Sequence, residues 1–332
     1  MLCLQSTMWC ATNRLLRVLM IFASLISILE ATTLRLSEHT NDESSHWSYD
    51  GENGPENWPG LCTHGSAQSP ININIANVVA QKFDELIFQN YDKTDLVTIV
   101  NNGHTEALQG FLTWSNVPTL SGGGLGARYK LREIHFHWAA SDDSGSEHTL
   151  DRLHYPLEAH LVHIREDLSV SEASVVEGGS AVLAVFFAIS DVGAPLQPYE
   201  AAFNTTVIAG TNKTVNCQPS ELLPTNRGSW FRYNGSFTTP TCDEVVTWTV
   251  LMEPLEITEQ QLNELEQQLN ELRHHLSYEG TELTHNLRGV QELNNRKVYM
   301  RSSNLFAGDF AMRPSTNLFV LFILIIFMLI SL

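Results

Sequence analysis

The sequence has few basic residues: its 332 residues include 19 lysines and arginines against 37 aspartates and glutamates, a formal net charge of −18 at pH 7. A protein that binds nucleic acid needs a clustered basic surface, so this balance excludes a nucleic-acid partner. Charged residues make up only 17% of the chain and hydrophobic residues 43%, which is typical of a globular protein with a sizeable core. The negative charge fits a well-solvated extracellular surface.

The sequence also lacks an apolar run of the about 20 residues that a membrane-spanning helix needs. Its two strongly apolar runs, residues 15–29 and 318–332, are both shorter. The first lies beside Arg14 and contains Arg17, which predicts a signal peptide over residues 1–31.

The second apolar run ends the chain with no charged residue behind it. A short apolar tail after a polar spacer and small residues favours a GPI-attachment signal, here over residues 302–332. The candidate attachment sites are Ser302-Ser303-Asn304 and Ala307-Gly308-Asp309. A short C-terminal membrane anchor is the alternative.

Histidines gather in one segment, where residues 133–138 read Glu-Ile-His-Phe-His-Trp and residues 158–163 read Glu-Ala-His-Leu-Val-His. Alternate side chains of a strand share a face, so His135 and His137 point one way, and an antiparallel return brings His160 to them. Three imidazoles with one open position match a catalytic zinc site. A lone histidine in a strand is more often structural, but Glu133 and Glu158 lie on the correct face to hold the ligands' other N–H groups.

These residues resemble the signature of the α-class carbonic anhydrases, in His135-Phe136-His137-Trp138, Gly145-Ser146-Glu147-His148-Thr149 and Glu158-x-His160-Leu161-Val162-His163. The resemblance covers about residues 46–301 as several separate motifs in the family's order. It implies a mainly β fold with a large twisted, mostly antiparallel central sheet, short peripheral helices and a catalytic domain over residues 44–301. It also implies a zinc enzyme that reversibly hydrates CO2 to bicarbonate and a proton.

The resemblance assigns individual roles. Zinc is held by His135, His137 and His160. The zinc hydroxide is oriented by Thr238, which donates its own hydroxyl proton to Glu147, while Thr239 contacts bicarbonate. The apolar wall for CO2 consists of Val162, Val182, Phe237 and Trp248. Protons leave through His104, and the connecting waters are organised by Tyr49 and Asn102.

Three cysteines remain once a signal peptide is removed: Cys62, Cys217 and Cys242. In an oxidising compartment two of them should pair and one should be left over. The resemblance implies that the bridge joins Cys62 and Cys242. Cys217 is then either buried and inert or paired between chains.

Three Asn-x-Ser/Thr sequons, at Asn204, Asn212 and Asn234, are potential glycan sites in an exported chain, and the first two lie in a polar loop. Together with the two terminal signals, they predict a protein on the extracellular face of the cell membrane. It would arrive there by the secretory pathway and be held by a lipid anchor.

Strands are expected at residues 108–114, 129–138, 181–189 and 245–251. One segment departs from the family: residues 259–265 are repeated unchanged as 266–272. Its leucines follow 3-4-3-4 spacing, at Leu262, Leu265, Leu269, Leu272 and Leu276. The stripe predicts either a longer surface helix or a contact helix for a homodimer.

Other departures bear on the rate. Glu133 stands where the family usually has Gln, and a carboxylate in this place makes the zinc a weaker acid. Phe237 stands where fast members usually have Leu, and its larger ring narrows access to the metal. Ala107, Gln109 and Gly289 also depart from the family's usual residues. The alternatives to a carbonic anhydrase are a catalytically weak, carbonic-anhydrase-like binding protein of the cell surface and a zinc hydrolase of esters.

Overall fold

The computed structural model describes residues 47–258 and 285–301, except 192, 194 and 207. The chain divides into two units, Met1–Trp47 and Ser48–Leu332, and all described residues except Trp47 belong to the second. The predicted signal peptide, the leucine repeat and the C-terminal tail lie outside the described residues. Within those residues, no helix combines the length and the apolar character needed to cross a membrane.

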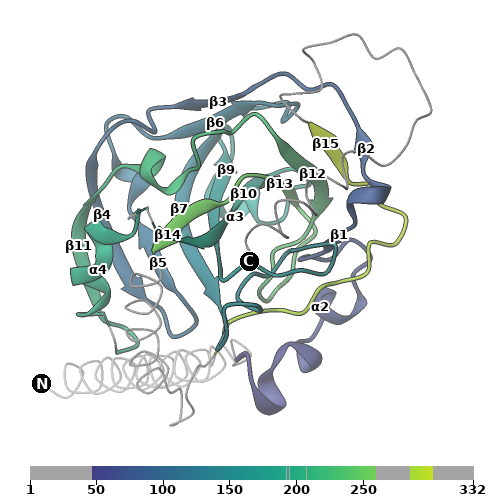
Figure 1. The fold of residues 1–332 in the computed structure, drawn as a ribbon, viewed down its shortest axis with the longest axis horizontal. Helices are drawn as coiled ribbons and strands as arrows, with labels where there is room; N and C mark the ends of the chain where they lie inside the picture. The colour runs from purple at the N-terminus through teal and green to yellow at the C-terminus, as the bar shows by residue number, and fades with distance from the viewer. Residues whose placement is uncertain (1–46, 192, 194, 207, 259–284, 302–332) are drawn as a thin grey trace, which may run out of the picture. The chain divides into compact units, whose positions relative to one another are not determined.

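Strands dominate the described part of the chain (Figure 1). The strands are β1 Asn72–Ile73, β2 Val79–Ala80, β3 Leu86–Gln89, β4 Asp95–Asn101, β5 Glu106–Gln109, β6 Thr119–Gly122, β7 Tyr129–Trp138, β8 Thr149–Leu150, β9 Leu157–Arg165, β10 Ser180–Ser190, β11 Asn212–Cys217, β12 Trp230–Gly235, β13 Val246–Leu251, β14 Leu255–Thr258 and β15 Tyr299–Arg301. The helices of the described residues are short: α2 Leu61–His64, α3 Val170–Ala173, α4 Gln197–Phe203, and the 3-10 turns η1 Gly51–Asn53, η2 Pro55–Asn57, η3 Ile75–Asn77, η4 Phe111–Thr113 and η5 Pro219–Leu222.

Thirteen of the described strands form one sheet, in the order β11-β4-β5-β7-β9-β10-β13-β12-β15-β2, with β14 paired to β10 and β3 joined through β6 to β7. The neighbours are antiparallel except for β10 with β13, β10 with β14, and β15 with β2. β1 and β8 form a separate parallel pair. The predicted fold class, a large and mostly antiparallel sheet with short helices around it, is confirmed.

The middle of the sheet is built from the most apolar segments. In β9 all residues but the last are buried, and in β10 the first eight are buried. A strand buried on both faces reads as a continuous apolar run rather than an alternating one. Burial of each large apolar side chain contributes about 1.5–3 kcal/mol, so these strands anchor the fold. The predicted strands at 129–138, 181–189 and 245–251 are confirmed within one residue at each end.

The strand predicted at residues 108–114 is wrong in its second half, because β5 ends at Gln109. Gly110 has a φ of 112°, a left-handed conformation that glycine adopts without the strain of a side chain. The 3-10 turn η4 follows, and the Thr113 side chain donates to the carbonyl of Gly110 at 2.7 Å. Gly110 therefore ends the strand, although the residues around it have a strand-like composition.

Register fixes which side chains share a face. Ala107 pairs with His135 and His135 with His160, so these residues face one side of the sheet. The neighbouring residues face the opposite side, where Phe136 packs against Phe187 and against Phe203 of α4, with ring centroids 6.4 and 6.1 Å apart. One face therefore carries the histidines and the other carries an aromatic core.

Candidate metal centre

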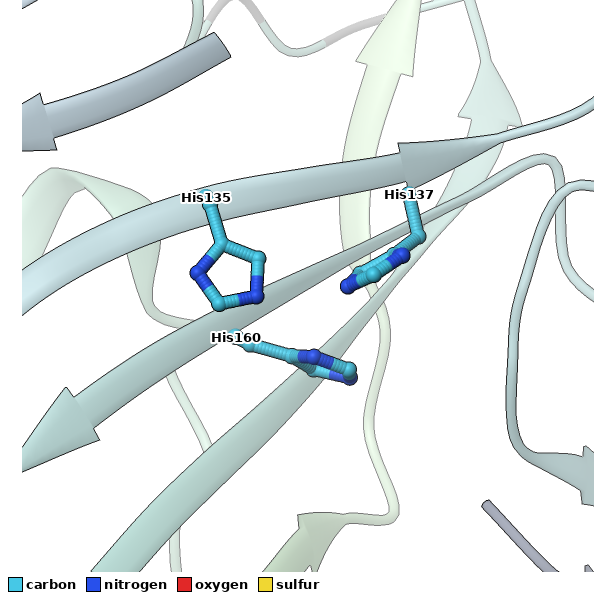
Figure 2. A group of neighbouring side chains, drawn as sticks. All are labelled: His135, His137 and His160. Atoms are coloured by element: carbon cyan, nitrogen blue, oxygen red, sulfur yellow. The ribbon is translucent and has the colours of Figure 1, made fainter. Parts of the chain in front are cut away.

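Three histidines converge on the face of the sheet that carries Ala107 (Figure 2). His135 and His137 come from β7, and His160 comes from its antiparallel neighbour β9. Their ring centroids are 5.1 Å apart for His135 and His137, 5.3 Å for His135 and His160, and 4.4 Å for His137 and His160. One nitrogen of each ring lies within 4.8 Å of the others, so the three could hold one metal ion.

A protein group faces the outer nitrogen of each of the three rings. His137 Nδ1 donates to the carbonyl of Asn286 at 2.8 Å, and His160 Nε2 donates to Glu158 Oε1 at 2.7 Å. His135 Nδ1 lies 3.4 Å from Glu133 Oε1. Such partners fix the tautomer and the orientation of metal-binding imidazoles, leaving the opposite nitrogen to face the ion.

The residues fit a metal cation. His137 Nε2 is buried and has no hydrogen-bond partner within the described ranges, which is costly unless something binds it. Burial and then the charges of His160 and His135 hold the pKa of His137 well below its usual value. Burial likewise lowers the pKa of His160 to about 4. Both rings are therefore neutral at pH 7, the form that binds zinc.

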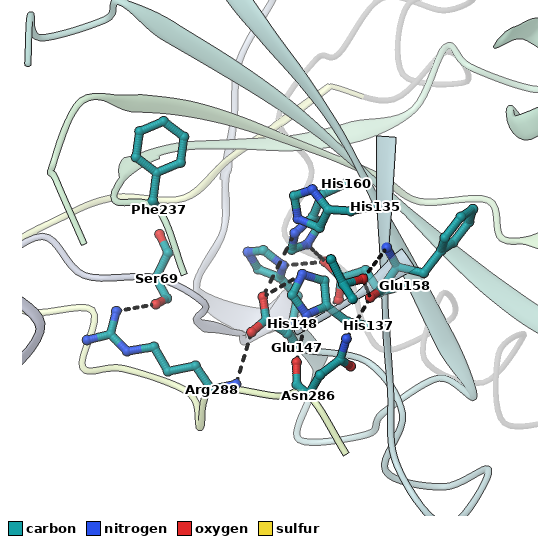
Figure 3. A network of polar contacts seen from close by, with 12 residues as sticks. Ser69, His135, His137, Glu147, His148, Glu158, His160, Phe237, Asn286 and Arg288 are labelled. Atoms are coloured by element: carbon teal, nitrogen blue, oxygen red, sulfur yellow. Dashed lines mark hydrogen bonds and ion pairs between the residues drawn. The ribbon is translucent and has the colours of Figure 1, made fainter. Parts of the chain in front are cut away.

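Glu147 lies directly behind the histidines (Figure 3). Its Oε2 is 3.6 Å from His137 Nε2, and its Oε1 accepts from the backbone N–H of Arg288 at 2.9 Å. Burial raises the pKa of Glu147 well above its usual value, whereas the hydrogen bonds from Arg288 and from the Thr238 hydroxyl oppose the rise. A cation at the histidines would oppose this rise and favour the carboxylate form.

A buried polar chain runs away from His160. Glu158 accepts from His160 Nε2 and from His148 Nδ1, both at 2.7 Å, and from the His148 backbone N–H at 2.8 Å. Burial alone would raise the pKa of Glu158, but the charges and hydrogen bonds of the two histidines hold it well below its usual value. His148 Nε2 shares a hydrogen bond with the Tyr233 hydroxyl at 2.6 Å, and this hydroxyl lies 2.9 Å from Ser69 Oγ. The group of His148, Glu158 and His160 is thus a satisfied hydrogen-bond chain.

The predicted apolar wall forms a row across the sheet beside these ligands. Val162 pairs with Val182, and Val182 pairs with Trp248. All three are buried in one apolar cluster, against which the partly buried Phe237 packs. The Trp248 ring lies 4.8 Å from His160, between ring centroids.

His104 lies in the turn between β4 and β5. The Asn102 Oδ1 atom accepts from the backbone N–H groups of His104 and Thr105, each at 2.9 Å, so this oxygen is used within the turn. The Tyr49 ring is 6.4 Å from the His104 ring between centroids. The Asn286 side chain donates to the carbonyl of His104 at 3.1 Å. The turn is thereby tied to the residue whose carbonyl orients His137.

The cysteines pair as the resemblance implies. Cys62 and Cys242 form a disulfide with a Cα–Cα distance of 5.1 Å. Cys217 is 1% exposed, and the Tyr199 hydroxyl donates to its sulfur at 3.2 Å. Of the two alternatives predicted for Cys217, buried or paired between chains, the structure therefore shows the buried one. A disulfide between chains at this sulfur would require the fold to open.

The structure also gives the exposure of the remaining residues singled out in the sequence. Asn204, Asn212 and Asn234 are all exposed, whereas Thr239 is partly buried in the loop that precedes Cys242. His163 is in the return segment but faces away from the ligands. It is fully buried, its Nδ1 bonds the carbonyl of Ala181 at 3.1 Å, and it contacts the Tyr91 hydroxyl.

Several residues of the hydrogen-bond network around the histidines were not predicted as site residues: Ser69, His148, Tyr233, Asn286 and Arg288. Among them, only His148 lies inside a motif that carries the family resemblance. Arg288 fills a buried position, donating to Ser69 O at 2.8 Å and to Gln68 Oε1 at 2.9 Å. Asn286 and Arg288 approach the site from a strandless segment distant in sequence, which no local pattern reveals.

Three histidines that converge from adjacent strands of a mostly antiparallel sheet, backed by a buried glutamate, define a mainly β protein with a three-histidine metal centre. Comparison with known families is decisive on the class: residues 53–302 match the model of the eukaryotic-type carbonic anhydrases. The chain belongs to this family, and it carries the histidine triad of a carbonic anhydrase zinc site.

Similar proteins carry the same description. Putative carbonic anhydrase 5 of Caenorhabditis elegans is 38% identical over 264 residues, covering 78% of this chain and 83% of the relative. Putative carbonic anhydrase 3 of the same organism is 39% identical over 259 residues, covering 77% of this chain and 97% of the relative. Carbonic anhydrase 4 of Mus musculus is 33% identical over 273 residues, covering 77% of this chain and 85% of the relative.

Proposed function

We propose that this protein catalyses the reversible hydration of CO2 to bicarbonate and a proton, with zinc as its metal. The observation that carries the proposal is the buried Nε2 of His137, which has no hydrogen-bond partner among the described residues and lies beside two further imidazoles on the same face of the sheet. When bound by His135, His137 and His160, zinc supplies a Lewis acid that makes a water molecule acidic near neutral pH.

Thr238 and Glu147 then act as an orienting gate. In this gate the Thr238 hydroxyl donates its proton to the Glu147 carboxylate, a hydrogen bond that opposes the rise in the pKa of Glu147 caused by burial. Because that proton is committed, the Thr238 oxygen can only accept from a group in the pocket. The pair therefore admits ligands that carry a proton and turns the lone pair of such a ligand toward CO2.

The apolar row beside His160 suits the substrate. CO2 is apolar and offers little to hydrogen-bond, so Val162, Val182 and Trp248 favour it over water, with Phe237 at the edge. Thr239 contacts the bicarbonate product. The same centre could act weakly on esters, but the gate and the small wall favour CO2.

His104 exports the proton. Histidine is the side chain whose ordinary pKa lies closest to neutrality, so it can accept a proton from the pocket and pass it to bulk water. Tyr49 lies beside His104, and Asn102 shapes the turn that carries it. These residues organise the waters between the centre and His104.

Two residues, Glu133 and Phe237, reduce the rate of CO2 hydration. The Glu133 carboxylate lies 3.4 Å from His135 Nδ1 and makes this imidazole more electron-rich than a neutral amide would, which weakens the acidity conferred by the metal. The ring of Phe237 narrows the approach. We propose a working enzyme slower than one with Gln and Leu in these places.

We propose that the enzyme acts at the outer cell surface, reached through the secretory pathway and held by a GPI anchor. The Cys62–Cys242 bridge supports an oxidising compartment, and the exposed sequons at Asn204, Asn212 and Asn234 support glycosylation there. A homodimer through the leucine repeat remains part of this proposal. Phosphatidylinositol-specific phospholipase should release the activity from cells, and activity that stays in the membrane fraction would favour a spanning tail.

Stopped-flow CO2 hydration by the purified protein, before and after a zinc chelator and after zinc is restored, tests the catalytic proposal. We expect activity that is lost with the metal and regained with it, at one zinc per chain. A protein that binds zinc but does not hydrate CO2 would instead be the catalytically weak binding protein of the cell surface.

A further inference from the structure

Glu106 is a buried acid that the proposed mechanism does not use. It begins β5, next to the turn that carries His104, and only 2% of its surface is exposed. Since Ala107 faces the metal side, Glu106 faces the aromatic core on the opposite side. A carboxyl group rarely occupies such a position unless it is paired.

The partner of Glu106 is Thr206, which follows helix α4. The Thr206 hydroxyl donates to Glu106 Oε1 at 2.9 Å and is itself fully buried. The carbonyl of Thr206 accepts from Asn101 Nδ2 at 2.8 Å. Asn101 and Glu106 are paired residues of β4 and β5, on the two sides of the His104 turn. Thr206 therefore binds both ends of the turn at once.

Asn101 extends these contacts into the turn itself. Its Oδ1 accepts from the backbone N–H of Gly103 at 3.0 Å, directly before His104. Its backbone carbonyl accepts from Gly210 at 2.8 Å, and its backbone N–H donates to Thr211 at 3.2 Å. The segment after α4 therefore contacts the base of the turn; α4 lies against β11, the neighbour of β4 (Figure 1).

The neutral form of Glu106 explains why the core accepts it. Burial raises the pKa of Glu106 to about 8, with only the Thr206 hydroxyl opposing the rise. At pH 7 the group is therefore mostly uncharged and accepts the Thr206 proton as a carbonyl would. Its Oε2 is buried with no hydrogen-bond partner in the described residues, a cost that a purely space-filling apolar side chain would avoid.

We propose that Glu106 is a positioning residue for proton export. Together with Asn101 and Thr206 it forms a clasp, here named the Thr206 clasp, that holds the His104 turn where its imidazole can reach the waters of the pocket. The inference rests on the proposed role of His104. It assigns Glu106 no contact with the metal, CO2 or bicarbonate.

The test compares Glu106→Leu and Thr206→Val, which break the clasp, with Glu106→Gln, which keeps the acceptor for Thr206. Thr249→Val is the matched control, because Thr249 is an equally buried hydroxyl that accepts from Arg232 away from this turn. All proteins are full-length and zinc-loaded. Because Thr206 is also the third residue of the sequon at Asn204, Thr206→Val would remove a glycan there, so all proteins are compared after enzymatic deglycosylation.

At low buffer concentration, Glu106→Leu and Thr206→Val should lower kcat by about threefold or more while kcat/KM stays unchanged, because a displaced proton carrier slows export alone. Glu106→Gln should restore most of the loss. In a His104→Ala background the same substitutions should cause no further loss. A fall in kcat and kcat/KM together, or an equal loss without His104, would assign Glu106 a merely structural role and overturn the proposal.

The NMR signal of the His104 ring separates this proposal from the mechanism on which it rests. The ring carbon–proton shift of His104 should move in Glu106→Leu and Thr206→Val but not in Thr249→Val. If His104→Ala leaves kcat unaltered in an active enzyme, proton export by His104 is wrong, while the ring signal still decides whether the clasp positions the turn. An unmoved signal in both clasp variants overturns the clasp.

Discussion

Replacing Glu106 by Gln should stabilise the protein, relative to the wild type, increasingly as the pH rises. Burial raises the pKa of Glu106 from its ordinary 4.5 to about 8. The folded protein therefore keeps this proton over a range in which the unfolded chain has released it. Stability is lost with rising pH wherever the folded state binds the extra proton, so the wild type loses this contribution between about pH 4.5 and pH 8.

The size of the effect follows from the same pKa. Each tenfold change in proton affinity is worth about 1.4 kcal/mol. Between about pH 5.5 and pH 8.5, the free energy of unfolding of the wild type should fall by about 3 kcal/mol relative to Glu106→Gln. All other titrating groups are shared by the two proteins and cancel in the difference. The buried amide has its own cost, but that cost does not change with pH.

Urea unfolding of both proteins, zinc-loaded and with the disulfide intact, measures this difference at each pH. The expected change is well above the extrapolation error of such titrations, about 10–15% of the free energy. A difference between the two proteins that is constant from acid to alkaline pH would refute the reasoning. Glu106 would then ionise in the core with its ordinary affinity, and its burial would need another explanation.

Four further outcomes are expected. His135→Ala should abolish zinc binding and CO2 hydration, because two imidazoles leave an incomplete centre; near-stoichiometric zinc by metal analysis with a normal rate would contradict this. Replacing both Cys62 and Cys242 by Ser opens a loop between residues 180 positions apart; it should lower the free energy of unfolding by up to about 5 kcal/mol, and an unchanged urea midpoint would speak against it. Glu133→Gln should move the midpoint of the pH profile of kcat/KM to lower pH, and a shift to higher pH would reverse the assigned effect of the carboxylate. His104→Ala should lower kcat but not kcat/KM, and added imidazole buffer should restore it, unless another group exports the proton.

The metal centre could be predicted from the sequence because its geometry follows from strand periodicity. Alternation put His135 and His137 on one face, and antiparallel pairing of the return segment placed His160 opposite His135. The row of Val162, Val182 and Trp248 is equally regular. The fold class followed from the resemblance, and the apolar character of β10 already indicated a central strand.

Residues outside regular strands could not be predicted in this way. Gly110 ends β5 by a backbone conformation that a strand-like composition conceals. Glu106 looks like an ordinary polar residue of an edge segment, because only the fold brings Thr206 against it. Asn286 and Arg288 reach the centre through packing between segments that are far apart in sequence, so no periodicity points to them.

Asn286 shows why such residues matter to the chemistry. Its backbone carbonyl accepts from His137 Nδ1, and its side-chain Oδ1 accepts from the Trp138 backbone N–H at 2.8 Å. Its Nδ2 donates to the carbonyls of His104 and Phe136 at 3.1 and 2.8 Å. The ligands need fixed positions and therefore stand on rigid strands. The proposed proton carrier, His104, belongs to a turn, which has no ladder of strand hydrogen bonds to hold it. Asn286 from one side and the Thr206 clasp from the other supply that restraint, so the distance from the metal centre to His104 is set by three segments that only the folded chain brings together.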